Sequence, residues 1–217
     1  MLEMSFWDTF IMDFRVHGFR HGDYLAMNVE EYRPYWAEVT RAIWSVSEDD
    51  LTSHFAANGE GRKKSISDSL NKLLKEEFES LGWASESPIF AEEEYSSGAG
   101  VFRLDFARGP FSVEVAFNHA NDAPWNLLKP TLASELNHVE KALQTEIGVI
   151  ITATEDMRSS GGFDNAIGTY EKYIRLLRPM GMLLTAPLVI VGLEAPETFR
   201  VEHERVGRRN LGHIVRI

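Results

Sequence analysis

The sequence has no cysteine, no long apolar run and few basic side chains relative to its acidic ones. Without cysteine, the 217 residues can form neither a disulfide framework nor a thiolate metal site. No stretch is long enough to span a bilayer, and the start lacks the basic region and apolar run of a signal peptide. We therefore expect a cytoplasmic protein with no membrane partner.

The charge balance restricts the possible nucleic-acid partners. Lysine and arginine total 22 against 33 aspartates and glutamates, which gives a formal net charge of −11. This argues against a protein that coats nucleic acid through charge alone, because phosphate binding depends on clustered cations. A sequence-specific binder that confines its basic residues to a cleft remains compatible with this charge.

Three common enzyme motifs are also missing. The chain has no Gly-x-x-x-x-Gly-Lys-Ser/Thr loop for nucleotide phosphates and no His-Glu-x-x-His zinc site. It also has no Gly-x-Ser-x-Gly nucleophile elbow. These absences leave carboxylates as the most informative candidates for catalysis.

The length suits one domain, residues 1–217, with residues 1–60 as an N-terminal elaboration and residues 62–217 as the core. Hydrophobic periodicity predicts three strands and four helices besides a central hairpin. The strands are expected near residues 13–19, 147–154 and 188–191, and the helices near residues 29–46, 65–81, 124–144 and 166–178. Residues 84–100 and 159–165 are expected to be loops. The order hairpin, helix, strand, helix, strand predicts an α/β fold with a mixed central sheet flanked by helices.

The central hairpin covers residues 101–117 and turns at Gly109 and Pro110. Alternation places phenylalanine, leucine and valine on one face and leaves Asp105 and Glu114 on the other. Two carboxylates from adjacent strands form a plausible half-site for a hard cation such as magnesium. The alternative is that both acids simply face solvent, as acids on amphipathic strands often do.

The residues after Asp105 resemble a nuclease family. Asp105, eight intervening residues and Glu114-Val115-Ala116 are followed by Asn118-His119, Ser134-Glu135-Leu136, residues 148–152, residues 187–193 and the tail with Arg208-Arg209. This ordered series resembles the PD-(D/E)XK nucleases, and most closely the BglII- and BamHI-type type II restriction endonucleases. The resemblance implies a restriction-endonuclease-like core that hydrolyses phosphodiester bonds of double-stranded DNA at a short palindromic site.

The resemblance also implies the metal site. Asp105, Glu114 and the carbonyl of Val115 would hold Mg²⁺, which polarises the scissile phosphate and activates a water. The third catalytic position, normally Lys, Glu or Gln, is Ala116 here. Its role has moved to another side chain, for which Lys129 is the candidate, or Ala116 is an inactivating substitution, or the protein binds DNA without cutting it. Glu76 or Glu77 could add a carboxylate, and the sequence does not choose between them.

By the same resemblance, DNA contacts are expected after the second hairpin strand and in the loop after the next strand. The residues predicted to contact DNA are Asn118, His119, Ser159, Ser160, Asn165, Arg205, Arg208 and Arg209. Arg62, Lys63 and Lys64, at a glycine-rich joint, could grip phosphates or simply be a solvated run. Cutting both strands of a palindrome with one centre per chain implies a homodimer.

The prediction is therefore a magnesium-dependent type II restriction endonuclease. One alternative is a DNA-binding or scaffold protein that keeps the nuclease fold without cleaving. Another is a repair or modification-dependent nuclease of the same superfamily. Discrete fragments would distinguish the first from the second, and indifference to sequence, or a need for methylated bases, would indicate the third.

Overall fold

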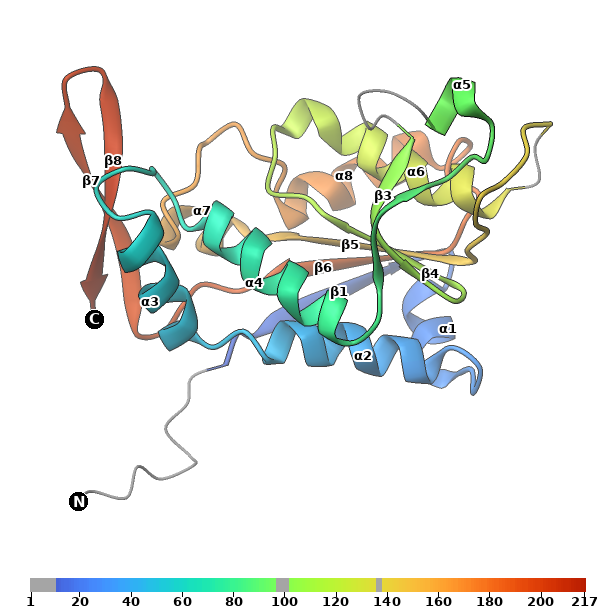
Figure 1. Ribbon diagram of the computed structural model, residues 1–217, viewed down its shortest axis with the longest axis horizontal. Coiled ribbons are helices and arrows are strands. Elements are labelled where there is room, and N and C mark those ends of the chain that lie inside the picture. The colour runs from blue at the N-terminus through green and yellow to red at the C-terminus, as the bar shows by residue number, and fades with distance from the viewer. Residues whose placement is uncertain (1–10, 97–101, 136–137) are drawn as a thin grey trace.

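The structure, a computed structural model, describes residues 11–96, 102–135 and 138–217. Its centre is a six-stranded mixed sheet with strand order β1-β6-β5-β4-β3-β2 (Figure 1). The strands of this sheet are β1 (Phe14–Phe19), β2 (Ala84–Pro88), β3 (Arg103–Arg108), β4 (Phe111–Val115), β5 (Ile147–Ala153) and β6 (Leu188–Leu193). This architecture confirms the predicted α/β fold class.

The middle of the sheet is parallel and its edges are antiparallel. Strand β5 runs parallel to both β4 and β6, whereas β1, β2 and β3 each pair antiparallel with their neighbours. Every residue of β5 and β6 is buried, which explains why these segments are almost entirely apolar. The C-terminal ends of β4 and β5 therefore lie at the same edge of the sheet.

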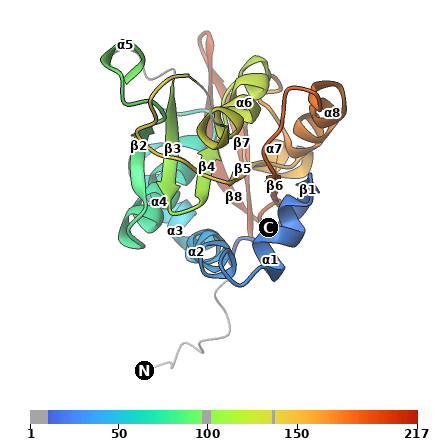
Figure 2. The same ribbon diagram turned by 90° about the vertical axis from the view of Figure 1, so that its right-hand side faces the viewer.

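Helices cover both faces of the sheet (Figure 2). The helices are α1 (Gly22–Asn28), α2 (Arg33–Trp44), α3 (Glu48–Asn58), α4 (Ser67–Ser80), α5 (Glu93–Ser96), α6 (Ala123–Ser134), α7 (Glu155–Ser160) and α8 (Tyr170–Met180), with a 3₁₀ turn at Ala120–Asp122. On one face, α2, α3 and α4 form a core with Phe111 and Val113 of β4. On the other, α6 and α8 pack against Ala116, Ile150 and Leu188. None of the helices in the described residues is long and apolar enough to cross a membrane.

Strands β7 (Phe199–Val206) and β8 (Arg209–Arg216) form a separate hairpin beyond α3 (Figure 1). The buried carboxylate of Glu48, in the first turn of α3, anchors the start of this hairpin. It accepts hydrogen bonds from the backbone N–H groups of Glu197 (2.7 Å) and Thr198 (2.9 Å). The bonds satisfy two backbone donors and fix β7 relative to α3.

Several predicted boundaries were wrong. The helix expected over residues 29–46 begins only at Arg33, with Pro34 in its first turn where proline is tolerated, and α3 was not predicted. The helix expected to reach residue 144 ends at Ser134, because Glu135 has an extended backbone. Residues 84–100, expected to be a loop, contain β2 and α5. Leu136 and Val101 lie outside the described residues.

Helix α6 lies unusually close to the sheet. A Cβ added at Gly148 of β5 would come within 2.4 Å of the Cβ of Pro130, which lies inside α6. Glycine at this position therefore permits the close approach of helix and strand. Lys129, the neighbour of Pro130 in this helix, is buried.

Candidate active site

The two strands of the central hairpin separate at Asp105. Their ladder pairs Arg108 with Phe111 and ends where Phe106 pairs with Val113. Beyond that pair, Oδ2 of Asp105 accepts a 2.7 Å hydrogen bond from the backbone N–H of Val115. The carboxylate of Asp105 thus replaces a backbone hydrogen bond of the β3–β4 ladder, and this hydrogen bond fixes its position where the strands separate.

A cleft of about 240 Å³ lies at this separation. Its lining residues come from α4, β2 and the two hairpin strands: Asn71, Lys75, Ser85, Glu86, Asp105, Phe106 and Val115. Neither Glu76 nor Glu77, the two acids considered from the sequence, lines the cleft. Helix α4 contributes an amide and a cation instead.

Glu86 is a strained residue in this cleft. Its φ is +49°, a left-handed conformation that costs free energy for a residue other than glycine. Strand β2 pairs with β3 on either side of it, Ser85 with Phe106 and Ser87 with Leu104. The charge of Glu86 contributes to raising the pKa of Asp105, so the two carboxylates are electrostatic neighbours. Strain held at such a position is common at functional sites.

Glu114 is buried and forms an ion pair with Lys129 of α6. The two residues are only 1% and 8% exposed, and Nζ of Lys129 donates to Oε2 of Glu114. The alternative that Glu114 merely faces solvent is therefore wrong. Its other oxygen, Oε1, is buried without a hydrogen-bond partner in the described residues.

Burial dominates the titration of both carboxylates. It is the largest cause that raises the pKa of Glu114 to about 8, and the nearby charge of Asp105 raises it further. The attraction of Lys129 acts in the opposite direction but does not outweigh burial. Burial likewise raises the pKa of Asp105, against the lowering effects of the Val115 N–H and of Lys129. Two acids in such a site bind protons readily, and a cation would favour their ionised forms.

The donor set fits a hard divalent cation. Magnesium is typically held by one or two carboxylates and retained waters. Asp105 and Glu114 provide two carboxylates, and the orphaned Oε1 of Glu114 provides an oxygen that lacks any donor. Within the described ranges, no three His, Cys, Asp or Glu side chains gather as a fuller metal site. Asp105 and Val115 line the cleft, whereas Glu114 is more deeply buried.

Ala116 lies in a packed environment. It is 1% exposed and belongs to the apolar cluster that includes Ala123 and Leu127, close to the start of α6. Its carbonyl accepts a 2.9 Å hydrogen bond from Oγ1 of Thr152. Lys129, the candidate for the migrated role, pairs with Glu114, and its catalytic role stays a prediction.

Asn118 and His119 follow β4 and are held by the loop after α7. The carbonyl of Asn118 accepts from Gly168 N–H (3.0 Å), and His119 forms a β-bridge with Ile167. Inside the protein, Nδ2 of the buried Asn126 donates to Oδ1 of Asn118 (3.3 Å) and to Oη of Tyr173 (2.8 Å). The exposed Asn118 is thereby connected to the same helix that carries Lys129.

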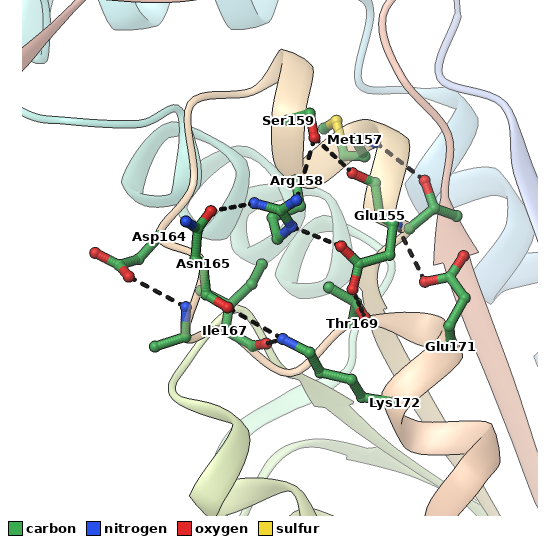
Figure 3. A network of polar contacts seen from close by, with 12 residues as sticks. Glu155, Met157, Arg158, Ser159, Asp164, Asn165, Ile167, Thr169, Glu171 and Lys172 are labelled. Atoms are coloured by element: carbon green, nitrogen blue, oxygen red, sulfur yellow. Dashed lines mark hydrogen bonds and ion pairs between the residues drawn. The ribbon is translucent and has the colours of Figure 1, made fainter.

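Ser159 and Ser160 were expected in a loop, but they form the last turn of α7. Thr154 caps this helix through its hydroxyl, which supplies the local signal that the sequence reasoning missed. Figure 3 shows the polar network around it: Arg158 donates to Glu155 (2.7 Å) and to Asn165, and Lys172 donates to the carbonyl of Ile167 (2.7 Å). These contacts fix the loop that holds Asn118 and His119.

The basic joint lies against the β7–β8 hairpin. Backbone bonds join Gly61 and Lys63 to Gly212 of β8, at 3.2 and 2.8 Å, and Nη2 of Arg209 donates to the carbonyl of Arg62 (3.1 Å). Residues far apart in the sequence thus lie together, since the joint with Arg62 and Lys63 contacts the hairpin that carries Arg205, Arg208 and Arg209. Lys63 and Lys64 are paired with Asp68 and Asp164, at 2.8 Å each, so their charges are partly neutralised.

Five of the seven residues that line the cleft were not predicted as site residues: Asn71, Lys75, Ser85, Glu86 and Phe106. The spacing of Asn71 and Lys75, four apart on one helix, indicates a shared face, but no sequence pattern indicates that this face borders the cleft. Nothing in the sequence singles out Glu86, because its conformation is one that glycine usually marks.

The chain is similar to a known family of nucleases and to solved structures from it. The family model "Restriction endonuclease BglII/BglIII" matches residues 14–193. Among solved structures, that of restriction endonuclease BglII complexed with a DNA 16-mer has a TM-score of 0.62 and 16% identity. Free BglII has a TM-score of 0.52 and 16% identity. Both alignments cover 95% of this chain and 100% of the other. No curated protein sequence matches the chain.

Proposed function

The chain belongs to the BglII/BglIII family of restriction endonucleases, and from this premise we propose that it is a magnesium-dependent type II enzyme of the PD-(D/E)XK superfamily. Its substrate is double-stranded DNA with a short palindromic site. The observation that carries the proposal is the convergence of Asp105 and Glu114 where β3 and β4 separate, with one buried carboxylate oxygen unpaired.

Each residue of the site has a role that its contacts support. Asp105, fixed by the Val115 N–H, presents one carboxylate to the cleft. Lys129 binds Oε2 of Glu114 and so orients Oε1, the oxygen that lacks a donor. Asp105, Glu114 and the carbonyl of Val115 would hold Mg²⁺. When bound, magnesium supplies charge stabilisation at the scissile phosphate and lowers the pKa of an attacking water.

DNA recognition is proposed for two surfaces. Asn118 and His119 are held at the C-terminal edge of the parallel strands, where amide and imidazole groups can read base edges. Arg62, Arg208 and Arg209 would contact phosphates. Ser159 and Ser160, at the end of α7, would contact DNA beside the loop that holds Asn118 and His119. A homodimer would place one catalytic centre on each strand of a palindrome. The similarity in fold to BglII complexed with a DNA 16-mer supports double-stranded DNA as the partner.

Digestion of unmethylated phage DNA tests the proposal. We expect discrete fragments that appear only when magnesium is added. If the protein retards the DNA in a gel without cutting it, the second candidate, a non-cleaving DNA-binding protein, is indicated. The alanine at the third catalytic position, Ala116, favours this candidate. A smear, or cleavage confined to methylated DNA, would indicate a repair or modification-dependent nuclease.

Substituting Ala116 distinguishes a natural alanine from an inactivating one. Because Ala116 is packed and Lys129 already pairs with Glu114, we expect Ala116→Gln to leave cleavage unimproved. We also expect it to lower the free energy of unfolding by about 1–3 kcal/mol, the usual effect of overpacking. Single-turnover cleavage and urea denaturation measure the two effects. A large gain in cleavage would show instead that Ala116 disables the enzyme.

A further inference from the structure

One wall of the cleft comes from α4, which the carboxylate motif does not include. Asn71 and Lys75 both line it, and they lie on one face of the helix because they are four residues apart. The Lys75 side chain is 45% exposed and has a long contact of 3.7 Å to Glu79. Its ammonium is therefore lightly held and accessible from the cleft.

The charges that line the cleft are unbalanced. Two acids, Asp105 and Glu86, face one cation, Lys75, among the described residues of the lining. Lys129 is not part of the lining, since it is buried against Glu114. Among the charged side chains that line the cleft, Asp105 and Glu86 would repel a phosphodiester, and only Lys75 would attract it.

We propose that Lys75 contacts a DNA phosphate bound in the cleft, with the amide of Asn71 as a neutral hydrogen-bond donor beside it. This inference rests on the proposed function and extends it to a residue outside the Asp105–Glu114–Lys129 group. The two lysines then have different roles. The buried Lys129 orients Glu114, and Lys75, which lines the cleft, binds the phosphate of the substrate.

The same helix provides a matched control. Lys72 lies one turn before Lys75, has a similar side-chain exposure of 56%, and also pairs with a glutamate four residues on, Glu76, at 2.9 Å. Lys72 does not line the cleft. Lys72→Ala and Lys75→Ala each remove one charge and one contact to a glutamate four residues on, and only Lys75 lines the cleft.

Two measurements compare these variants. In single-turnover cleavage of phage DNA with magnesium, we expect Lys75→Ala to be slower than the parent by about 10²-fold, as for other lost charge-stabilising groups, and Lys72→Ala to be unchanged. In binding of a 30-base-pair duplex without magnesium, Lys75→Ala should reduce the slope of log K against log salt by about 0.9, the value of one phosphate contact. Lys75→Arg, which keeps the charge, should retain most of the binding.

The two measurements separate the inference from the function on which it rests. If the parent cleaves DNA and Lys75→Ala behaves like Lys72→Ala in both assays, the inference is overturned and the nuclease proposal stands. If the parent does not cleave, the nuclease proposal fails, and the salt slope alone decides whether Lys75 contacts phosphate. An unchanged slope in Lys75→Ala overturns the inference in that case too.

Discussion

Replacing Lys129 with methionine is expected to lower the free energy of unfolding by about 1 kcal/mol more at pH 8.5 than at pH 5.5, because the pKa of Glu114 is about 8 in the presence of Lys129. Without that cation, Glu114, which is 1% exposed, stays protonated at pH 8.5 and loses the free energy of ionisation. Methionine has a similar length and no charge, so the effect reports the ion pair rather than a cavity.

The loss should depend on pH in a defined direction. The pKa of Glu114 is raised to about 8 in the folded protein, against about 4.3 in an unfolded chain. A raised folded pKa gives stability that is complete below the unfolded pKa and declines as the pH rises through the folded pKa. Lys129→Met removes an attraction that lowers this pKa and therefore extends the decline to higher pH. The deficit should be clearly smaller at pH 5.5, where Glu114 is protonated.

Urea denaturation in the presence of a chelator, at pH 5.5 and 8.5, measures this difference. The double variant Lys129→Met/Glu114→Leu serves as the control, because removing both charges should restore most of the stability. A deficit equal at both pH values, or one that persists in the double variant, would mean that Lys129 stabilises the fold by packing rather than by its charge.

Replacing Asp105 with asparagine is expected to reduce single-turnover cleavage by about 10²–10³-fold, as for removal of a charge-stabilising group at a transition state. Asparagine can still accept the hydrogen bond from Val115 N–H, so the separation of β3 and β4 should persist. The substitution also removes a charge that raises the pKa of Glu114, and that pKa should fall.

Glu30→Gln is a charge-matched control for this variant, since it removes one exposed carboxylate before α2. It should leave the cleavage rate within about two-fold of the parent, the usual small effect of a surface change. Carbon-13 NMR titration of the glutamate carboxyls follows the pKa of Glu114. Equal cleavage by Asp105→Asn and the parent would remove Asp105 from the catalytic centre.

The elements with strong periodicity could be predicted from the sequence. The buried strands β5 and β6 appear as continuous apolar runs, and α4 and the β3–β4 hairpin have regular apolar spacing. From the hairpin alone, Asp105 and Glu114 could be placed together. Lys129 was predicted only as a candidate for the role of position 116, from a resemblance and from the alanine there, and its pairing with Glu114 was not predicted.

Other features depend on tertiary contacts that no local pattern encodes. The burial of Glu114 follows from β4 being an inner strand with α6 close above it, so an alternating hairpin pattern suggested an exposed face that does not exist. The left-handed backbone of Glu86 and the position of Lys75 at the cleft depend on how α4 and β2 meet the hairpin. Helix α6 ends at Ser134 because the backbone of Glu135 is extended, and no proline or glycine follows directly to mark this end in the sequence.

The most direct test of the catalytic centre is the single-turnover cleavage rate of Glu114→Gln beside the parent, on the same phage DNA with magnesium. Glutamine keeps an acceptor for Lys129 and removes only the charge. The account predicts discrete fragments from the parent and a rate lower by about 10³-fold or more from the variant, at unchanged fold by circular dichroism. Equal rates from the two proteins would contradict it, because phosphodiester hydrolysis would then not depend on the buried carboxylate at the centre of the site.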